Sequence, residues 1–563
     1  MKWIRGVLLL VSASAALAQT FTATVRGVVN DASGAVVSGA MITLTHVDQN
    51  RSVKYTTNQN GEYEFLQVPP GNYTLTAEAT GFKKYQRSGM VLEVAQVAAI
   101  DIRLEVGAVT ESIEITAQAP LIETASSTLG EVVNGKSADA LPLNGRNSLQ
   151  LVALTPGINT TSAFRTASIS NGSIPAVAFS ANGGRNVSNE VILDGSSQIV
   201  MGYNQPAYVP TPDALQEFKV QTNNLSAEYG RTGGAVINLV HRSGTSEFHG
   251  VLYDFLRNDK FDSKNFFDNL NGKPKSPFRY NQFGGTLGGP LTTSRQTTFF
   301  FVNFEGIREN QPSSAVFSVP TAKMKQGDFT EIANRIYDPA TVDAAGNRSL
   351  FPGNAIPASR FDPAAVNILS YYAAPTSPGV SNNYFSQLGT KTVSNNISAK
   401  LDRKISDRQS LFGRISWNNF DQDLPNFFGN AASLNAGITG NHNLSSTLDD
   451  TYVLGRWILH GNYGYAYAAN PRSSVTNSFD PTTLGLPASL KSAEQFLVFP
   501  RVDATGETSL GGDVAWIIGN KFETHTWSGD ASHLTGDHSI KFGGVFRLNK
   551  VSNFRPSAPA GNY

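Results

Sequence analysis

The chain has 563 residues, which is too long for one ordinary domain and suggests about three or four. Its 44 basic and 44 acidic residues cancel, so it lacks the excess positive charge typical of nucleic-acid-binding domains. It contains no cysteine, which excludes a disulfide scaffold, iron–sulfur or thiolate-zinc ligation and a cysteine nucleophile. Only 16% of the residues are charged, against roughly 25% in average proteins, although the apolar content is an ordinary 40%.

Residues 1–18 have the pattern of a secretory signal peptide. Lys2 and Arg5 give it a positive start, an apolar stretch follows, and an Ala-Leu-Ala motif predicts cleavage between Ala18 and Gln19. The apolar stretch is shorter than the roughly 20 residues that a membrane-spanning helix needs. Because no later segment approaches that length, we expect export without a helical span, to the periplasm, the outside or an outer membrane entered as a β-barrel.

Residues 19–105 consist of short β-rich runs separated by turn residues, which predicts an all-β sandwich. In the run that begins at Gly71, Tyr73, Leu75 and Ala77 alternate with polar residues, as expected for a strand with one buried face. The predicted strands are Ala23–Val29, Ala40–His46, Val53–Thr57, Tyr63–Phe65, Gly71–Ala79 and Ala98–Leu104.

This segment resembles the carboxypeptidase regulatory-like domain, a transthyretin-like sandwich. The resemblance lies in GVVNDASGAVVSGAMITL from Gly27, NQNGEYEFLQVPPGNYTLTAEATGF from Asn58 and IDIRLEVG from Ile100. A zinc carboxypeptidase would need a His-x-x-Glu pair, and none of the eight histidines has Glu three residues later. The resemblance therefore implies a folding and docking module without peptidase activity.

A short alternating segment follows the sandwich and could add as a strand to an exposed sheet edge of a partner. It resembles the TonB box of TonB-dependent receptors, and the alternative is a plain first strand of the next domain. This candidate TonB box consists of Glu111, Ser112, Ile113, Glu114, Ile115, Thr116 and Ala117.

Mixed periodicity over residues 106–247 predicts a compact α/β domain. Asn147 can cap a helix with apolar residues at helical spacing, and Thr211-Pro212 can open a second helix over Asp213–Phe218. Strands are expected over Glu190–Leu193 and Gly234–Val240.

Three strings in this segment, LPLNGRNSLQLVALTPG, FSANGGRNVSNEVILDG and PDALQEFKVQTNNLSAEYGRTGGAVINLVHRSGTSEFHG, resemble the plug of TonB-dependent outer-membrane transporters. Their order is similar to the Oar-like branch, which carries a regulatory-like domain in front. The resemblance implies a plug that occludes a β-barrel until energy passed on by TonB loosens it.

Residues 248–563 read as strands of a transmembrane antiparallel β-barrel. Near the end of the chain, Ile540, Phe542, Phe546 and Leu548 share one side of a strand, and polar residues such as Lys541 and Arg547 share the other. SLFGRISWN and NNISAKLDRKIS alternate in the same way. Residues 310–395, rich in Pro, Asn and Ser, are expected to form long surface loops.

The resemblance also implies about 22 strands, each of roughly 9–11 residues before loops are added. Residues 248–563 leave only about 14 residues per strand with loops included, the long loops expected over 310–395 reduce this further, and the chain ends in a Pro- and Ala-rich run. We therefore expect a partial barrel, as in the N-terminal part of a longer protein.

Enzyme motifs are missing: the sequence has neither a Gly-x-Ser-x-Gly elbow nor a His-Glu-x-x-His zinc motif. We predict no catalytic residues, no metal site and no cofactor. Contacts with an extracellular ligand are expected from plug and loop tips, around Arg185, Asn186 and Tyr203.

Taken together, the sequence predicts a mainly β receptor or transporter in the outer membrane of a Gram-negative-type bacterium, with the sandwich in the periplasm. Its expected partners are a TonB-type energy-transducing complex, outer-membrane lipid and an unidentified extracellular ligand, and no nucleic acid. Two alternatives are an outer-membrane adhesion protein without active transport and a secreted enzyme with an accessory sandwich.

Overall fold

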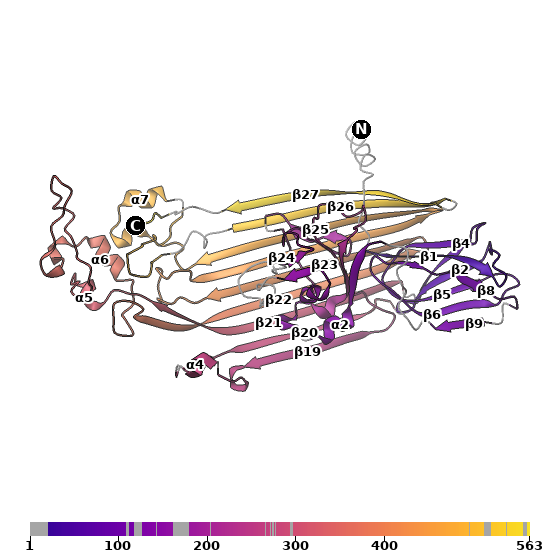
Figure 1. The fold of residues 1–563 in the computed structure, drawn as a ribbon, viewed down its shortest axis with the longest axis horizontal. Helices are drawn as coiled ribbons and strands as arrows, with labels where there is room; N and C mark the ends of the chain where they lie inside the picture. Colours follow the sequence, from indigo (N-terminus) through magenta and orange to yellow (C-terminus); the bar gives the residue numbers. More distant parts are fainter. Residues whose placement is uncertain are drawn as a thin grey trace, which may run out of the picture.

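A computed structural model describes residues 21–108, 112–116, 127–141, 143–160, 179–202, 204–264, 266–270, 272, 275, 277–292, 297–494, 496–511, 519–535, 538–554 and 560–563. It has a sandwich at one end, a curved sheet of long strands, and a small domain against one face of that sheet (Figure 1). We call these the sandwich, the wall and the plug. The predicted signal peptide, with its cleavage point between Ala18 and Gln19, lies outside the described residues.

The sandwich confirms the predicted all-β domain. Its described strands form two sheets, one in the order β4-β1-β7 with β8 also paired to β1, the other in the order β3-β2-β5-β6-β9. Ile42, Tyr63 and Leu75 are among the side chains that fill the core between the sheets. The strands are β1 (Ala23–Asp31), β2 (Met41–His46), β3 (Arg51–Thr56), β4 (Glu62–Val68), β5 (Gly71–Glu78), β6 (Lys84–Leu92), β7 (Val97–Ala99), β8 (Ile102–Leu104) and β9 (Ser112–Thr116).

Strand β6 is absent from the sequence-based prediction because its alternation is interrupted. Its pairing with β5 shifts register after Arg87, where Gly89 adopts a φ of 72°. Such a bulge inserts an extra residue and breaks the two-residue period that predicts strands. Tyr85 and Met90 both face the core although they are five residues apart.

The plug has a sheet in the order β10-β17-β18-β13-β14 within its described part. Leu149, Phe218 and Ile237 are fully buried in its core. The sheet strands are β10 (Leu129–Asn134), β13 (Glu190–Leu193), β14 (Ser196–Ser197), β17 (Leu215–Asn223) and β18 (Val236–His241). The smaller elements are α2 (Gly135–Ala140), η1 (Asn144–Arg146), η2 (Ser148–Leu154), β11 (Ile158–Thr160), β12 (Phe179–Ala181), β15 (Ile199–Val200), β16 (Gln205–Pro206) and η3 (Pro212–Ala214).

Two helix predictions in the plug need correction. The predicted helix Asp213–Phe218 is wrong, because the single turn η3 ends at Ala214 and β17 begins at Leu215. Pairing of β17 with both β10 and β18 supplies its backbone hydrogen bonds, so tertiary pairing overrides the local helix signal. Asn147 does cap a helix, accepting from the Leu149 N–H at 3.1 Å, but that helix is the 3₁₀ segment η2.

The wall confirms the predicted antiparallel strands. In the described residues it has nine of them, and each pairs with its neighbour in chain order from β19 to β27. Strands β19 and β27 are not paired with each other there, so the sheet is open. The strands are β19 (His249–Asn258), β20 (Arg279–Pro290), β21 (Thr298–Phe317), β22 (Tyr384–Ser406), β23 (Gln409–Leu424), β24 (Gly437–Leu454), β25 (Trp457–Ser474), β26 (Gly519–Thr535) and β27 (His538–Phe554).

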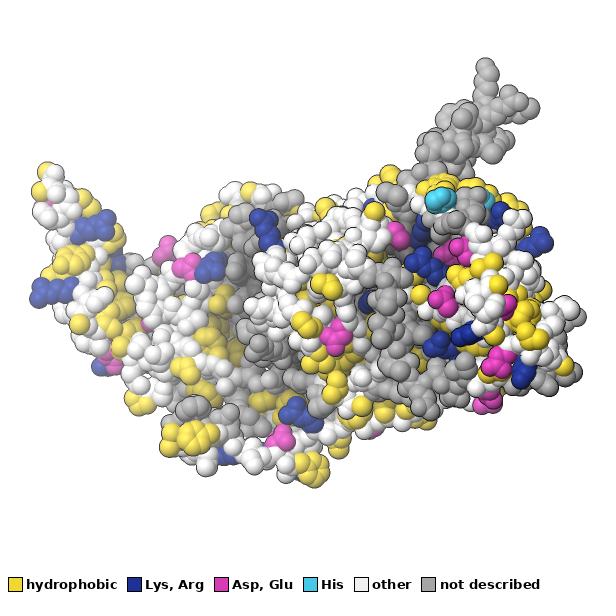
Figure 2. All heavy atoms as spheres, turned by 45° about the vertical axis from the view of Figure 1, so that its right-hand side comes forward, with side chains coloured by type: hydrophobic (Ala, Val, Ile, Leu, Met, Phe, Trp, Pro, Cys, Tyr) yellow, Lys and Arg dark blue, Asp and Glu magenta, His cyan; other side chains and the backbone are white. Residues whose placement is uncertain are grey.

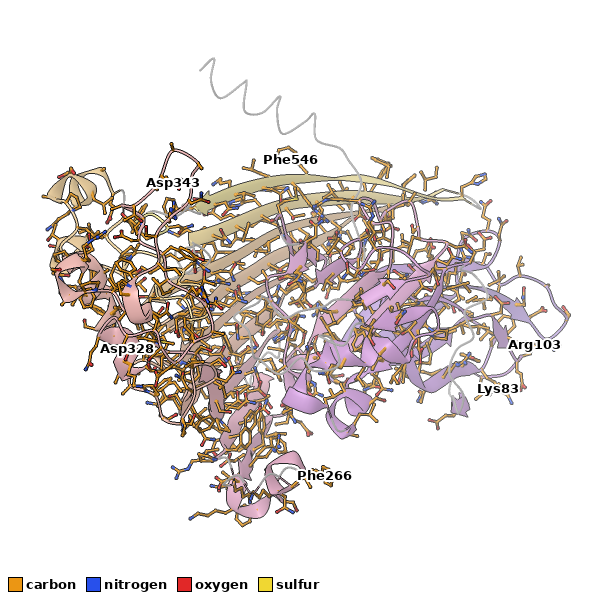
Figure 3. The ribbon with its side chains drawn as sticks, turned by 60° about the vertical axis from the view of Figure 1, so that its left-hand side comes forward. Lys83, Arg103, Phe266, Asp328, Asp343 and Phe546 are labelled. Atoms are coloured by element: carbon orange, nitrogen blue, oxygen red, sulfur yellow. The ribbon has the colours of Figure 1, made fainter. Side chains whose placement is uncertain are left out.

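The two faces of the wall have opposite character. Ile415 and Phe546 are 54% and 61% exposed on the outer face, and Phe546 lies at the edge of the molecule in Figure 3. Arg414 and Ser416, on the inner face, are 3% and 1% exposed because the plug covers them. An apolar outside and a polar inside are what a lipid-embedded sheet around a wet interior requires. In Figure 2, Lys, Arg, Asp and Glu side chains are frequent on the sandwich, at the right of the view.

The two ends of the wall also differ. Turns at the sandwich end are short, as between Ser406 and Gln409, whereas long connections lie at the other end. This asymmetry is typical of periplasmic turns and extracellular loops. The prediction of loops over 310–395 is too wide, because β21 and β22 stay paired out to Phe317 and Tyr384.

The long connections pack on one another around their own apolar core, which includes Val319, Tyr372, Leu484, Phe499 and Leu510. No helix among the described residues is long and apolar enough to cross a membrane. The helical turns of the connections are η4 (Asp259–Phe261), α4 (Phe266–Leu270), α5 (Ala322–Lys325), η5 (Pro352–Asn354), η6 (Ala358–Arg360), α6 (Pro363–Leu369), η7 (Pro481–Leu484) and α7 (Ala488–Ala493).

Replacing Leu448 by Arg should destabilise the wall by about 2–4 kcal/mol, because Leu448 lies mid-strand on the outer face of β24 and is 52% exposed. Leu454→Arg, at the end of the same strand beside the turn, should cost about 0–1 kcal/mol. The measurement is urea unfolding of the chain in lipid vesicles. Equal losses from the two variants would contradict a lipid-facing outer surface.

Candidate functional site

A buried ionic cluster joins the plug to the wall. Asp194, in the turn after β13, lies 3.3 Å from the Lys400 Nζ on β22 and 2.8 Å from the Arg414 Nε on β23. All three side chains are almost completely shielded from solvent. Burial alone would raise the pKa of Asp194, but the two cations outweigh it and hold that pKa below its ordinary value. The carboxylate therefore stays ionised between two wall cations.

His241, at the end of β18, completes this cluster without adding charge. Its backbone N–H donates to Asp194 Oδ1 at 3.0 Å, and its carbonyl accepts from the Lys400 Nζ at 3.1 Å. Its Nδ1 lies 2.9 Å from the Arg242 carbonyl, which can only accept, so Nδ1 carries the proton and Nε2 accepts from the Ser398 hydroxyl at 2.8 Å. Burial lowers the pKa of His241 to about 3, which keeps the imidazole neutral.

A second ionic contact reaches the first strands of the wall. Arg146 of the plug pairs with Asp213 and lies 3.5 Å from Glu305 on β21. Its guanidinium also lies over the rings of Tyr253 and Phe255 on β19, 4.7 and 5.0 Å from their centroids. Arginine suits such a site because its planar group combines ion pairing with stacking.

A third contact reaches β27. Glu190 of the plug accepts from Ser197 and pairs with Arg547 at 3.0 Å, and Glu228 pairs with Lys541 at 3.1 Å. Lys541 and Arg547 lie on the inward face that the sequence predicts for this strand. Ion pairs thus hold the plug at three places along the wall, and apolar contacts add to them, among them the one around Val200 and Phe522. Polar contacts of this kind can exchange for hydrogen bonds to water, more readily than a large apolar interface can.

The sandwich docks on the plug and the wall through a separate interface. Phe21 and Val94 pack against Val240, and the Phe21 ring meets Phe412 of β23 edge-on. The Val94 N–H donates to Glu217 Oε1 at 2.5 Å, which buries that carboxyl between plug and sandwich. Burial raises the pKa of Glu217 to about 8. Further hydrogen bonds join Gln49 to Gly244, Gln216 to Pro70 and Gln67 to Asp530.

The candidate TonB box lies in part on the sandwich. Residues Ser112–Thr116 form β9, which pairs in parallel with β6, while Glu111 and Ala117 lie outside the described residues. Glu114 is exposed and Ile113 is half-buried. The segment therefore has the extended conformation that strand addition requires.

The predicted ligand contacts are only partly described. Arg185 and Asn186 lie exposed in the connection between β12 and β13, and Tyr203 lies outside the described residues. Sequence reasoning missed the cluster around Asp194 and the docking role of Glu217. The sequence does place Lys400 and Arg414 at inward positions of wall strands. Because a buried charge needs a partner of opposite charge, these two residues could have indicated the cluster. Among the described residues, no group of His, Asp and Glu side chains is arranged to hold a metal ion.

Two family models match the chain. Residues 240–563 match the family described as outer membrane beta barrel domain, and residues 24–105 match the carboxypeptidase regulatory-like domain. A curated relative, the TonB-dependent transporter Oar from Myxococcus xanthus, is 27% identical over 305 residues, which cover 52% of this chain and 27% of that protein. These matches confirm the predicted resemblances to the carboxypeptidase regulatory-like domain and to Oar-like outer-membrane transporters.

Solved structures of transporters and receptors are also similar. The outer membrane transporter YddB from Escherichia coli has 12% identity and a TM-score of 0.48, covering 76% of this chain and 49% of that one. The siderophore receptor PirA from Acinetobacter baumannii has 13% identity and a TM-score of 0.41, with the same coverage. The chain thus spans about half the length of these two structures. The curated relative Oar is named a transporter, in agreement with the predicted class of protein.

Replacing Asp194 by Asn should lower the free energy for opening the plug by about 3–5 kcal/mol, because Lys400 and Arg414 would stay buried without a counter-charge. Amide hydrogen exchange in β13 and β18 measures this opening. Glu228→Gln is the matched control, since its pair with Lys541 is partly exposed and should contribute less than about 1 kcal/mol. Equal protection of the β13 and β18 amides in the two variants would contradict the conclusion that the Asp194 cluster holds the plug on the wall.

Docking of the sandwich should weaken as the pH rises. Burial raises the pKa of Glu217 from about 4.5 to about 8, so the docked state favours the protonated carboxyl. The stabilisation that Glu217 gives to docking is therefore complete below about pH 4.5 and is lost as the pH rises through about 8. Spin labels on cysteines introduced at Ser33 and Ala227, in this cysteine-free chain, would report the distance between sandwich and plug. We expect a broader distance distribution at pH 9 than at pH 6, and no such change in Glu217→Gln. A pH response that survives in this variant would assign the effect to another group.

Proposed function

The chain belongs to the outer-membrane β-barrel family and lies in the outer membrane, and from this premise we propose that it is part of a receptor or transporter energised through a TonB-type complex. The observation that carries the proposal is the plug, which lies against the polar inner face of the wall and is held there by buried ion pairs. An adhesion protein would have no need of an internal domain attached through contacts that can exchange for water.

The energy must come from a partner, because no ATP is available at the outer membrane. The relative Oar is by name TonB-dependent, which supports the same source of energy here. Residues 111–117 are the proposed contact, since β9 is already extended and lies at the edge of the sandwich sheet. With the short turns of the wall in the periplasm, the sandwich and β9 lie on the side where such a partner would reach them.

Ligand capture is assigned to the opposite end of the molecule. There the connections between wall strands pack around a shared apolar core, so they present a preformed surface. A captured ligand would lie above the plug, and passage would require the plug to leave its ion pairs with Lys400, Arg414 and Arg547.

Deleting Glu111–Ala117 should abolish binding of the purified periplasmic domain of the host's TonB protein and should abolish energy-dependent uptake. Pull-down with the detergent-solubilised chain measures the first effect, and whole-cell uptake with and without a protonophore measures the second. Replacement of Ala32 and Ala35 by Ser, in an exposed surface turn of the sandwich, is the control and should leave both unchanged. Unchanged uptake after the first deletion would rule out the transport proposal and favour the adhesion alternative.

A further inference from the structure

Strand β9 is the last strand of the sandwich sheet that runs β3-β2-β5-β6-β9. It pairs in parallel with β6 over its whole length, from Lys84 opposite Ser112 to Ser88 opposite Thr116. The solvent-facing side of this pairing is polar, with the Ser88 hydroxyl 3.4 Å from Glu114 Oε1. The pairing therefore makes the proposed partner-binding segment a structural part of the sandwich.

The other edge of β9 has no neighbouring strand among the described residues. A strand carries backbone donors and acceptors on both edges, so β6 uses one set and leaves the second available. In Figure 1 this edge lies on the side of the sandwich opposite to β4 and away from the plug, where no element of the wall covers it.

We propose that the sandwich presents β9 as a preformed edge, and that a strand of the TonB-type partner adds to its available side while β9 stays paired with β6. One continuous sheet would then run from the sandwich into the partner. This inference rests on the proposed function, and it adds that the sandwich remains in the complex as a platform and does not compete with the partner.

The physical advantage is pre-organisation. A disordered segment must lose its backbone entropy when it binds, whereas β9 has lost that entropy already on folding. Main-chain hydrogen bonds then supply the affinity of strand addition, as in other cases of sheet extension.

A second consequence concerns force. A force applied to β9 acts on the whole sandwich, because β9 is paired within its sheet. The sandwich is hydrogen-bonded to the plug through Val94–Glu217 and Pro70–Gln216. A further hydrogen bond, Gln49–Gly244, joins it to the segment just before the first wall strand. The sandwich would therefore transmit the pull to the base of the plug through its docking interface.

A disulfide between β6 and β9 tests the proposal. Gln86 and Glu114 are register partners, and because Gln86 and Glu114 both contact Ser88 they lie on the same polar face. Neighbouring strands bring such positions within disulfide range, and the chain has no other cysteine. The variant Gln86→Cys/Glu114→Cys would be compared, oxidised and reduced, for binding to the purified periplasmic domain of the host's TonB protein.

We expect the oxidised form to bind with a dissociation constant within about threefold of the reduced form, since β9 need not leave β6. A loss of tenfold or more on oxidation would overturn the proposal and would show that the partner displaces the sandwich. Thr43→Cys/Thr76→Cys, which crosslinks β2 to β5, is the matched control for a disulfide elsewhere in the same sheet.

Hydrogen exchange on the unmodified chain gives an independent answer if the crosslink disturbs folding. The partner should add protection to amides of Ser112–Thr116 while protection of β6 persists. Loss of protection in β6 on binding would overturn the platform model. Absence of any binding to the unmodified chain would instead contradict the proposed function itself, so the two failures can be told apart.

Discussion

Hydrocarbon offers no partners for polar groups, and this constraint governs the rest of the molecule. It forces the wall strands to pair along their length and to direct apolar side chains such as Ile415 and Phe546 outward. Polar side chains then collect on the inner face, where they need partners of their own. The plug supplies them, and for this reason the contact between plug and wall consists largely of ion pairs and hydrogen bonds.

That polar contact is both specific and breakable. Asp194 pairs with two wall cations at once. If the plug left the wall and no water entered, Lys400 and Arg414 would remain without a counter-charge in a low-dielectric environment. Once water enters the interface, it can solvate these charged groups, and the free energy needed to separate the plug from the wall falls. A plug fastened in this way can be stable at rest and can still separate from the wall, as the proposed function requires.

The sandwich is attached to both the plug and the wall. Its sheet includes β9 at one edge, and its Phe21, Val94 and Gln67 contact the plug and the wall at another side. Glu217 lies between the sandwich and the plug, where burial makes the protonation of its carboxyl part of the docking energy. The domain resembles a carboxypeptidase regulatory module, but its contribution here is an edge strand and a docking surface.

The sequence by itself determined the sandwich, the mixed plug and the two-faced wall strands, because each depends on local periodicity and turn residues, as in the alternation around Ile540 and Phe546. It did not reveal β6, whose bulge at Gly89 breaks that periodicity, or β17, where pairing on both sides overrides a helix signal. Only the tertiary structure decided which charges meet. Asp194, Lys400 and Arg414 are far apart in the chain, and no local pattern encodes a contact made by closing a plug against a wall.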